Sequence, residues 1–289
     1  ETWEAARRIG SALAGMSEAR RPIPVLGEKS VETVQTFFGI VNAGCFYILL
    51  DPKQPGSRLQ QILKTLDATL LVVMSEDHRK TADALGFEGK IVYYEQMKDS
   101  EEDGDVLDVI RANAADVDPL YVNFTSGSTG IPKGVVVSHR SVIDFMEYFP
   151  ELFEITEEDV IGNQAPFDFD VSVKDIYATL KTGATMVMIP KQYFSFPTKL
   201  LDYLCERNVT TLIWAVSAVC IISTLKGFDY KVPEKINKVL FSGEVMPIKH
   251  LNIWRKYLPK AQFVNLYGPT EITCNCTYYK IDREFQKGD

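Results

Sequence analysis

Segments with the apolar pattern of strands alternate with segments patterned as helices along most of this chain, which restricts its fold more than any other feature. Expected helices cover residues 30–41, 57–66, 172–181 and 197–207. Expected strands cover residues 46–50, 70–73, 120–124, 135–137, 184–189, 210–214, 238–241 and 262–266. Strands that alternate with helices pair into mainly parallel sheets. The sequence therefore predicts an α/β protein.

The helix expected at 172–181 has signals at both of its ends. Ser172 and Asp175 form a Ser-x-x-Asp capping pattern at the start, and Gly183 follows the end. By contrast, the acidic stretch 99–105 has no apolar periodicity. We expect a solvated loop there.

A glycine-rich segment, Thr125 to Gly134 (TSGSTGIPKG), combines four hydroxyl side chains, three glycines and one lysine. Its backbone N–H groups, hydroxyls and lysine suit the phosphates of a nucleotide. It is not a Walker A loop, because Lys133 is followed by Gly134 and a strand rather than by Ser or Thr and a helix. The Gly-x-Gly-x-x-Gly spacing of a dinucleotide site is also missing. An ordinary Gly/Ser/Thr-rich hairpin loop is the alternative interpretation.

Two further glycine turns directly follow expected strands. They are Ser242-Gly243-Glu244 and residues 265–271 (NLYGPTE). In open α/β sheets, ligands bind outside the carboxyl ends of the strands. We therefore expect these two turns and the loop at Thr125 to converge on one ligand.

Composition and charge argue against several classes of protein. The 289 residues are 46% hydrophobic and 24% charged, as in ordinary soluble globular proteins. The net charge of −8 argues against nucleic acid as the main partner, although a local lysine can still bind ATP. Five cysteines without a Cys-x-x-Cys pair and three dispersed histidines argue against a zinc site. Reduced thiols and a cytoplasmic location are expected, and the longest apolar stretch, 212–222, is too short to span a membrane.

Motifs distributed along the chain together resemble the adenylate-forming superfamily. They are the glycine-rich loop, residues 43–47 (AGCFY) with Asp51-Pro52, residues 169–172 (FDVS), Ser242-Gly243-Glu244 and residues 265–271. The most similar branch comprises the amino-acid adenylation domains of nonribosomal peptide synthetases, with D-alanine–carrier protein ligases as near relatives. The likeness runs almost end to end, and its specificity lies in the order of the motifs.

The resemblance implies the large N-terminal domain of these enzymes, with two mainly parallel α/β sheet lobes packed together. Residues 1–118 would form the first lobe and residues 119–289 the second. The family's ribose-binding aspartate motif and its small C-terminal domain, which carries a lysine that bridges carboxylate and phosphate, have no counterpart before Asp289. The resemblance also implies that an N-terminal portion of that domain is not included. We therefore expect a fragment of a longer protein that does not catalyse the reaction by itself.

The implied function is ATP-dependent activation of an amino acid as an aminoacyl-adenylate, with release of pyrophosphate. The amino acid would then be loaded onto the phosphopantetheine thiol of a carrier protein, and neither nucleic acid nor a membrane is an expected partner. Two alternatives remain. A D-alanine–carrier protein ligase is disfavoured because the position of Ser242 is typically cysteine there, and a non-catalytic nucleotide-binding module is disfavoured by the intact loop and Glu271.

The resemblance also implies a set of nucleotide-binding residues. ATP or AMP would contact Thr125, Ser126, Gly127, Ser128, Thr129, Gly130, Gly243, Glu244, Asn265, Leu266, Tyr267, Gly268, Pro269 and Thr270. Catalytic roles would fall on Thr125, Lys133 and Glu271, with Glu271 binding Mg²⁺, a hard cation that prefers oxygen ligands. Tyr267 would stack on adenine. Taken alone, Tyr267 could instead be a core aromatic, and Glu271 a solvated charge.

A second implied set surrounds the amino-acid substrate. It comprises Asp170, Val171, Lys174, Trp214, Leu240, Ser242, Leu266, Cys274 and Asn275. Asp170 would pair with the α-ammonium group, which favours an amino acid over an acyl or aryl acid; the alternative is that it caps the following helix. Leu240, Ser242 and Leu266 resemble pockets for small polar amino acids, serine above all.

Four residues have alternative or purely structural interpretations. Lys174 lies off the apolar stripe of its expected helix, so it is either a solvated lysine or an inward one that needs a partner. The run 272–279 is patterned as a strand that carries Cys274 and Cys276, for which a redox or metal pair is the alternative to a pocket role. His139 has no acid or nucleophile nearby in the sequence, so a structural role is expected.

Overall fold

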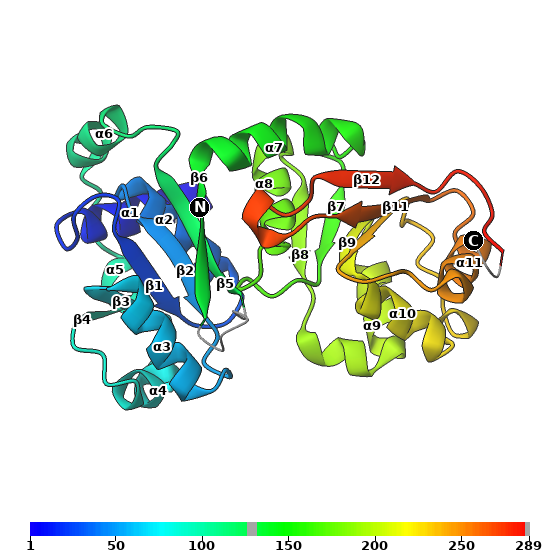
Figure 1. Ribbon diagram of the computed structural model, residues 1–289, viewed down its shortest axis with the longest axis horizontal. Coiled ribbons are helices and arrows are strands. Elements are labelled where there is room, and N and C mark those ends of the chain that lie inside the picture. The colour runs from blue at the N-terminus through cyan, green and yellow to red at the C-terminus, as the bar shows by residue number, and fades with distance from the viewer. Residues whose placement is uncertain (126–131, 287–289) are drawn as a thin grey trace. The chain divides into compact units, whose positions relative to one another are not determined.

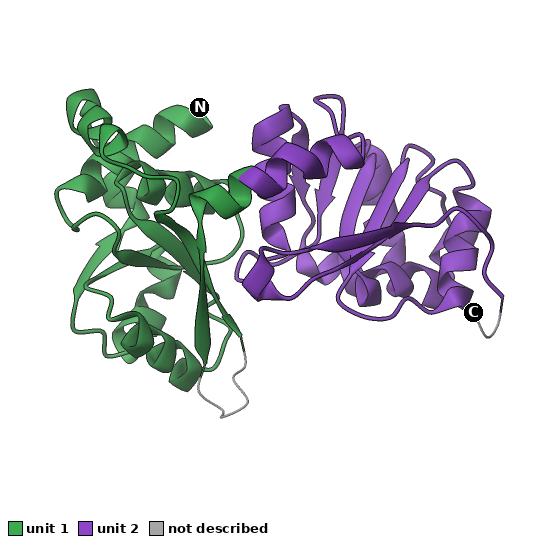
Figure 2. Cartoon of the chain, turned by 45° about the horizontal axis from the view of Figure 1, so that its top comes forward, with its two compact units in different colours: residues 1–143 green, residues 144–289 purple. Residues whose placement is uncertain are grey.

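The computed structural model describes residues 1–125 and 132–286, and the chain divides into two compact units, residues 1–143 and 144–289 (Figure 2). Each unit contains its own six-stranded sheet with helices packed against it (Figure 1). The predicted α/β class is therefore confirmed for the described residues.

The first sheet is parallel except for one edge strand. Its strands are β1 (Pro22–Leu26), β2 (Phe46–Leu50), β3 (Leu70–Val73), β4 (Lys90–Tyr93), β5 (Pro119–Thr125) and β6 (Lys133–Ser138), in the order β4-β3-β1-β2-β5-β6. Only the pairing of β5 with β6 is antiparallel among the described strands of this sheet. Because β5 and β6 belong to this sheet, the division between the units lies between Ile143 and Asp144 rather than at the expected 118/119 boundary.

The second sheet repeats this arrangement. Its strands are β7 (Val160–Asn163), β8 (Thr185–Met188), β9 (Thr211–Ala215), β10 (Lys238–Ser242), β11 (Gln262–Tyr267) and β12 (Thr277–Lys280), in the order β12-β11-β10-β9-β7-β8. Edge strand β12 is antiparallel to β11, and the other described pairs are parallel.

Helices connect most consecutive strands. They are α1 (Thr2–Ala14), α2 (Val31–Asn42), α3 (Gly56–Leu66), α4 (Arg79–Ala84), α5 (Tyr94–Met97), α6 (Gly104–Ala112), α7 (His139–Leu152), α8 (Ser172–Thr182), α9 (Pro197–Glu206), α10 (Val216–Thr224) and α11 (Ile248–Tyr257). The predicted loop at 99–105 is wrong at its end, because the Asp103 carboxylate accepts a hydrogen bond from the Val106 N–H at 3.1 Å and caps α6.

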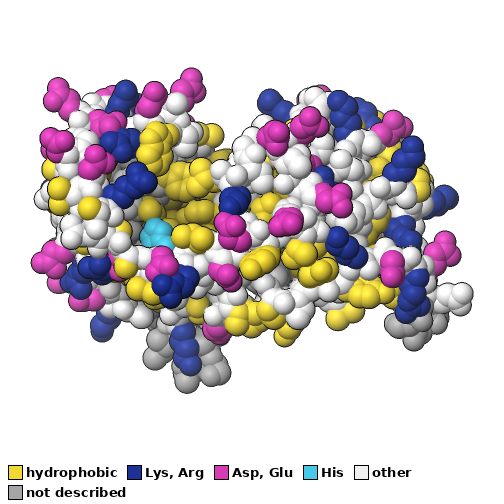
Figure 3. All heavy atoms as spheres, turned by 90° about the horizontal axis from the view of Figure 1, so that it is seen from above, with side chains coloured by type: hydrophobic (Ala, Val, Ile, Leu, Met, Phe, Trp, Pro, Cys, Tyr) yellow, Lys and Arg dark blue, Asp and Glu magenta, His cyan; other side chains and the backbone are white. Residues whose placement is uncertain are grey.

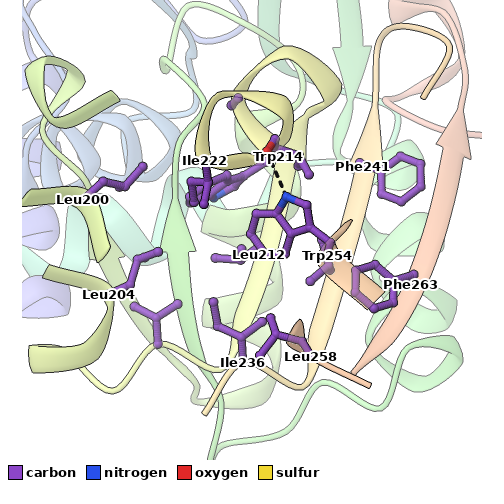
Figure 4. Close-up of a cluster of buried hydrophobic side chains, with 14 of the residues drawn as sticks. Leu200, Leu204, Leu212, Trp214, Ile222, Ile236, Phe241, Trp254, Leu258 and Phe263 are labelled. Atoms are coloured by element: carbon purple, nitrogen blue, oxygen red, sulfur yellow. Dashed lines mark hydrogen bonds between the residues drawn. The ribbon is translucent and has the colours of Figure 1, made fainter. Parts of the chain in front are cut away.

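One face of the second sheet is covered by α9, α10 and α11 around a large apolar cluster (Figure 4). Trp254 is fully buried in it, and its indole N–H donates to the Val219 carbonyl at 3.0 Å. Helix α8 packs against β7 and β8, and its buried residues are not members of this cluster. We therefore assign α8 to the opposite face of the second sheet. The candidate site is built on that face.

The amino ends of β7, β9 and β10 are joined by a buried polar network around Asp159. Its carboxylate accepts hydrogen bonds from the hydroxyls of Thr210 (2.7 Å) and Thr211 (2.8 Å) and from the Lys238 ammonium (2.9 Å). Burial raises the pKa of Asp159, but these bonds and one from the Thr156 N–H outweigh burial and hold the pKa below its usual range. This network fixes the end of the sheet opposite the candidate site.

Charged side chains of both signs are interspersed over the face of the molecule shown in Figure 3. Among the described residues in this view, the Lys and Arg side chains do not form one continuous surface. Among the described residues, no helix has the length and apolar character needed to cross a membrane.

Candidate functional site

The carboxyl ends of four neighbouring parallel strands meet at one edge of the second sheet. The strands end at Asn163, Ala215, Ser242 and Tyr267. The segments that leave these ends carry Asp170, the Ser242-Gly243-Glu244 turn and residues 267–271. Two of the three predicted turns therefore share a sheet edge, whereas Thr125 ends β5 in the first sheet.

Asp170 lies in the segment between β7 and α8 and is half-buried. Burial raises the pKa of its carboxyl group, while a hydrogen bond with the Thr270 hydroxyl and the charge of Lys174 act in the opposite direction. Val171, rather than Asp170, occupies the cap position of α8. A carboxylate that is costly to bury suits a cationic partner such as an ammonium group.

The predicted capping pair of α8 is wrong. The Ser172 hydroxyl donates to the Phe169 carbonyl at 2.7 Å, and the Asp175 carboxylate accepts a hydrogen bond from the Asn163 amide at 2.5 Å. The reason is that a turn at Phe169 already makes Ser172 helical, so Ser172 lies one residue past the cap position. Asp175 instead links the first turn of α8 to the end of β7.

Lys174 is the buried cation of this site, with 1% of its surface exposed. Its Nζ donates to the Asn275 side-chain oxygen at 2.7 Å. Burial lowers the pKa of its ammonium group, and the nearby Cys274, Asp175 and Asp170 oppose this shift. The solvated-lysine alternative is therefore wrong. Periodicity could not reveal this, because the partner of Lys174 lies 101 residues further along the chain.

The connection between β11 and β12 forms a tight turn that carries much of the site. Gly268 is needed there, because a Cβ atom would lie 2.5 Å from the Asn275 Cα and 2.7 Å from the Cys274 carbonyl oxygen. Thr273 and Cys274 both have left-handed backbones, with φ of 64° and 68°. The Cys274 thiol donates to the Asp170 carbonyl at 3.0 Å. The turn is thereby bonded to the segment that precedes α8.

The strand predicted over 272–279 is confirmed only in its last part, because the turn occupies the residues before Thr277. A 3₁₀ helix, Thr270–Ile272, comes first, and β12 begins only at Thr277. Cys274 is buried and Cys276 is exposed, so the two thiols are not equivalent neighbours on a strand. Among the described residues, no group of three or more His, Cys, Asp or Glu side chains is arranged to hold a metal ion.

The faces of the second sheet separate two sets of predicted pocket residues. Paired residues of neighbouring strands share a face, so Leu240 and Ser242 lie on the same face as Leu266. Trp214 pairs with Phe241 on the opposite face, where its indole N–H donates to the Gly162 carbonyl at 2.7 Å. The structure thus does not bring Trp214 together with the other proposed substrate residues. Val171 is half-buried at the start of α8.

The proposed adenine-binding residues are exposed or half-buried at the same sheet edge. The Tyr267 side chain is 69% exposed, so it is not a core aromatic. Gly243 and Glu244 are exposed after β10. Glu271 is exposed as well, which leaves its interpretation as a solvated charge open. Asn265 and Thr270 are half-buried, Pro269 is exposed, and Leu266 is buried.

In the first unit, the structure brings Thr125 and Lys133 together. They are paired residues at the end of the antiparallel β5–β6 ladder, on either side of the glycine-rich loop. Lys133 is exposed and Thr125 is half-buried. The predicted phosphate ligands between them, Ser126, Gly127, Ser128, Thr129 and Gly130, lie outside the described residues.

His139 is the first residue of α7. It is half-buried, and burial lowers the pKa of its imidazole, an effect that the charge of Asp118 partly offsets. Its backbone N–H donates to the Asp118 carbonyl at 3.0 Å. These contacts agree with the structural role expected for His139.

The motif order and the fold agree with comparisons against known proteins. A model of the family described as AMP-binding enzyme matches residues 1–288. The chain belongs to this family. The resemblance noted from the sequence motifs is therefore confirmed.

Two curated members of the AMP-binding enzyme family illustrate the relationship. A D-alanine–D-alanyl carrier protein ligase of Bacillus velezensis is 32% identical over 289 residues, which cover 98% of this chain and 56% of the ligase. A mycosubtilin synthase of Bacillus subtilis is 31% identical over 272 residues, which cover 91% of this chain and 10% of the synthase polypeptide. The chain thus spans about half of the ligase and a tenth of the synthase polypeptide.

Solved structures share the fold of this AMP-binding chain. The nonribosomal peptide synthetase FmoA3 superposes with a TM-score of 0.85 at 23% identity, covering 99% of this chain and 30% of FmoA3. The four-domain synthetase AB3403, bound to AMP and glycine, superposes with a TM-score of 0.83 at 21% identity, covering 97% of this chain and 20% of AB3403. The predicted α/β fold of two mainly parallel sheets, shared with these synthetases, is confirmed.

Proposed function

We propose that this chain forms the nucleotide- and amino-acid-binding part of an enzyme that activates an amino acid with ATP. A carboxylate oxygen of the amino acid attacks the α-phosphorus of ATP. A new acyl–oxygen–phosphorus bond forms, and the bond to the leaving pyrophosphate breaks. The enzyme must hold the carboxylate in line with that bond, neutralise phosphate charge and exclude water.

The observation that carries this proposal is the contact between Asp170 and Thr270. Asp170 is the proposed partner of the α-ammonium group, and Thr270 belongs to the segment proposed to bind the nucleotide. The Asp170 carboxylate and the Thr270 hydroxyl lie close together at one end of the second sheet, and the hydroxyl acts to lower the pKa that burial raises. A chain that joins an amino acid to a nucleotide needs these two groups of residues to be adjacent.

The exposed residues after β10 and β11 are suited to the nucleotide. The exposed Tyr267 ring offers a face for adenine, and the backbone of Gly243 and Glu244 is accessible at the neighbouring strand end. Thr125 and Lys133, together with the loop between them, are proposed to bind the phosphates. The hydroxyl and the ammonium group supply donors and positive charge.

Magnesium would bind through Glu271. Mg²⁺ in nucleotide sites is held by one or two carboxylates together with phosphate oxygens and water, so a single exposed carboxylate is an adequate protein ligand. When bound, the ion neutralises phosphate charge. Thr270, next to Glu271, adds a hydroxyl at the same position.

The proposed acceptor of the activated amino acid is the phosphopantetheine thiol of a carrier protein. The name of the Bacillus velezensis ligase states a carrier protein partner for that relative. Because that ligase matches 98% of this chain, a D-alanine–carrier protein ligase remains the second candidate. Ser242, where such ligases typically have cysteine, disfavours it.

Pyrophosphate exchange into ATP, measured on the natural full-length protein with each proteinogenic amino acid and with D-alanine, tests the proposal. We expect exchange that depends on one or a few amino acids. Exchange with none of them would contradict the proposal and favour a non-catalytic nucleotide-binding module. A clear preference for D-alanine would select the second candidate.

A further inference from the structure

We propose that Lys174, held in place by Asn275, selects an amino acid whose side chain is an uncharged hydrogen-bond acceptor, such as a hydroxyl or a carboxamide. This inference rests on the proposed function, because it names the substrate class of the same site. It is carried by the burial of Lys174, by its single described hydrogen-bond partner and by the charges around it.

The first step is the count of donors on Lys174. An ammonium group has three N–H donors, and buried donors without acceptors are costly. The side chain is 1% exposed, so bulk water does not reach it. Within the described residues, the hydrogen bond to the Asn275 side-chain oxygen at 2.7 Å is the one in which Nζ donates. Two donors are therefore available for the side chain of a bound amino acid.

The second step is the orientation of the ammonium group. Asn275 lies in the tight turn after β11, next to Cys274, whose thiol is bonded to the Asp170 carbonyl. Two bonds thus join this turn to the segment that contains Asp170 and Lys174. Asn275 holds the ammonium group near the carboxylate that is proposed to bind the α-ammonium group. A substrate anchored at Asp170 would place its side chain close to Lys174.

The third step is charge. The Cys274 thiol and two carboxylates, Asp175 and Asp170, lie near enough to interact electrostatically with the buried Lys174 ammonium group. With Lys174 charged, the ammonium group and the two carboxylates have a net charge of −1. The α-carboxylate of a bound amino acid is the group that reacts with the α-phosphorus of ATP, so at this end of the pocket its α-ammonium group brings the sum to zero. A substrate with a side-chain carboxylate would return it to −1 in a buried setting, so an uncharged acceptor is favoured over an acidic one.

The fourth step concerns the other side chains proposed around the substrate. Leu240 and Leu266 are buried and offer no hydrogen-bonding side-chain groups, whereas the buried Ser242 offers one hydroxyl on their face. Recognition of a polar side chain therefore falls on Lys174 and Ser242. An ordered water molecule bonded to Lys174 is the competing explanation for its two remaining donors.

The test is a substrate profile of the natural full-length protein by pyrophosphate exchange. We expect the highest kcat/KM with a hydroxyl or carboxamide amino acid, and lower values with aspartate, glutamate and apolar residues of similar size. A profile led by an acidic, aromatic or branched aliphatic amino acid would overturn the inference and leave amino-acid activation intact. Exchange with no amino acid would instead remove the proposed function on which it rests.

A variant of Lys174 shows whether its two remaining donors bind the substrate side chain or only an ordered water molecule. Lys174→Met keeps the length of the side chain and removes the donors. We expect kcat/KM for the preferred polar amino acid to fall roughly 10- to 100-fold relative to that for alanine, the effect of one or two lost hydrogen bonds. The matched control is Lys181→Met on the same helix, where the lysine is exposed and pairs with Glu147. An unchanged order of preference in Lys174→Met would overturn the inference.

Asn275→Ala keeps the proposal testable if Lys174→Met fails to fold. Without Asn275 the Lys174 ammonium group loses its fixed position. The ratio of kcat/KM for polar over apolar substrates should therefore fall, while KM for ATP changes little. An equal loss for all substrates and for ATP would show that Asn275 only supports the turn.

Discussion

A half-buried carboxylate, Asp170, is the proposed partner of the α-ammonium group of the amino acid. Asp170→Ala should raise the amino-acid KM roughly 30- to several-thousand-fold, because losing one partner of a desolvated charge pair costs about 2–5 kcal/mol. Asp170→Asn should be similarly impaired, since it keeps the shape and loses the charge. Steady-state kinetics of pyrophosphate exchange measure both constants.

Two comparisons make this result specific. Asp144→Ala removes an exposed carboxylate of the same unit and should leave both KM values unchanged. If Asp170→Ala raised the KM for ATP as much as that for the amino acid, Asp170 would be a structural residue rather than the partner of the α-ammonium group.

Asp170 and Asp159 should have opposite effects on the free energy of unfolding. Hydrogen bonds hold the pKa of Asp159 below its usual range, so its stabilisation is present above the unfolded pKa and is lost as the pH falls through the folded pKa. Burial raises the pKa of Asp170, so its ionised form is destabilising at neutral pH, and this cost falls as the pH drops below the folded pKa and is absent below the unfolded pKa.

At pH 7 and without ligands, Asp159→Asn should therefore destabilise the protein by roughly 1–3 kcal/mol, because buried donors lose their acceptor. Asp170→Asn should be neutral or stabilise it by about 1 kcal/mol, as replacements of strained site residues often do. Urea unfolding at pH 7 and at acidic pH measures both, with Asp144→Asn as the exposed control. Destabilisation by Asp170→Asn equal to that by Asp159→Asn would show that the two carboxylates do not differ in this way.

Lys174 shows why some site residues escape prediction at the residue scale. Its helix was expected from the apolar stripe of Val173 and Ile176, and that helix is confirmed. The stripe identifies the face that packs on the sheet, yet Lys174 is covered by Asn275 from a distant turn. Burial by a segment that is distant in the sequence cannot be predicted from local periodicity.

The individual elements divide into those fixed by local sequence and those fixed by distant contacts. Strands β2 and β3 begin and end where their apolar runs predict, because each run is uniformly buried in a parallel sheet. The strand expected over 272–279 begins only at Thr277, and the residues before it belong to the turn at 268–276. Its left-handed Thr273 and Cys274 oppose local preference and are held by contacts with Asp170 and Lys174.

Gly268 tests whether that turn positions the site. In Gly268→Ala the new Cβ would lie 2.5 Å from the Asn275 Cα and 2.9 Å from the Cys276 nitrogen, which are backbone atoms that cannot move independently. We expect a loss of about 1–3 kcal/mol in the free energy of unfolding. Binding of both AMP and the amino acid should weaken, since the turn carries residues proposed for each. Chemical denaturation and calorimetric titration measure these effects.

The matched control for this change is Gly15→Ala. No atom lies within 4 Å of the Cβ that it would add, and the backbone there has an ordinary φ of −85°. Gly268→Ala and Gly15→Ala could instead have the same free energy of unfolding and the same ligand affinities. The close approach of the Gly268 backbone to the backbone of residues 274–276 would then have no part in shaping the site.

At the scale of the whole molecule, the division into two units with separate sheets and cores predicts separable unfolding. The tryptophans provide a probe of one unit. Trp214 and Trp254 are buried in the second unit, whereas Trp3 in the first unit is 58% exposed. A change in tryptophan fluorescence on unfolding therefore reports mainly on the second unit, while far-ultraviolet circular dichroism reports on both.

Leu71 and Leu212 form a matched pair for this experiment, because both are fully buried strand leucines, one in each unit. Each Leu→Ala change should cost about 2–5 kcal/mol. Leu212→Ala should lower the urea midpoint seen by fluorescence. Leu71→Ala should lower the urea midpoint of only part of the circular dichroism transition. If both variants moved both signals equally, the two cores would unfold as one cooperative unit, and the compact units would not be independent in stability.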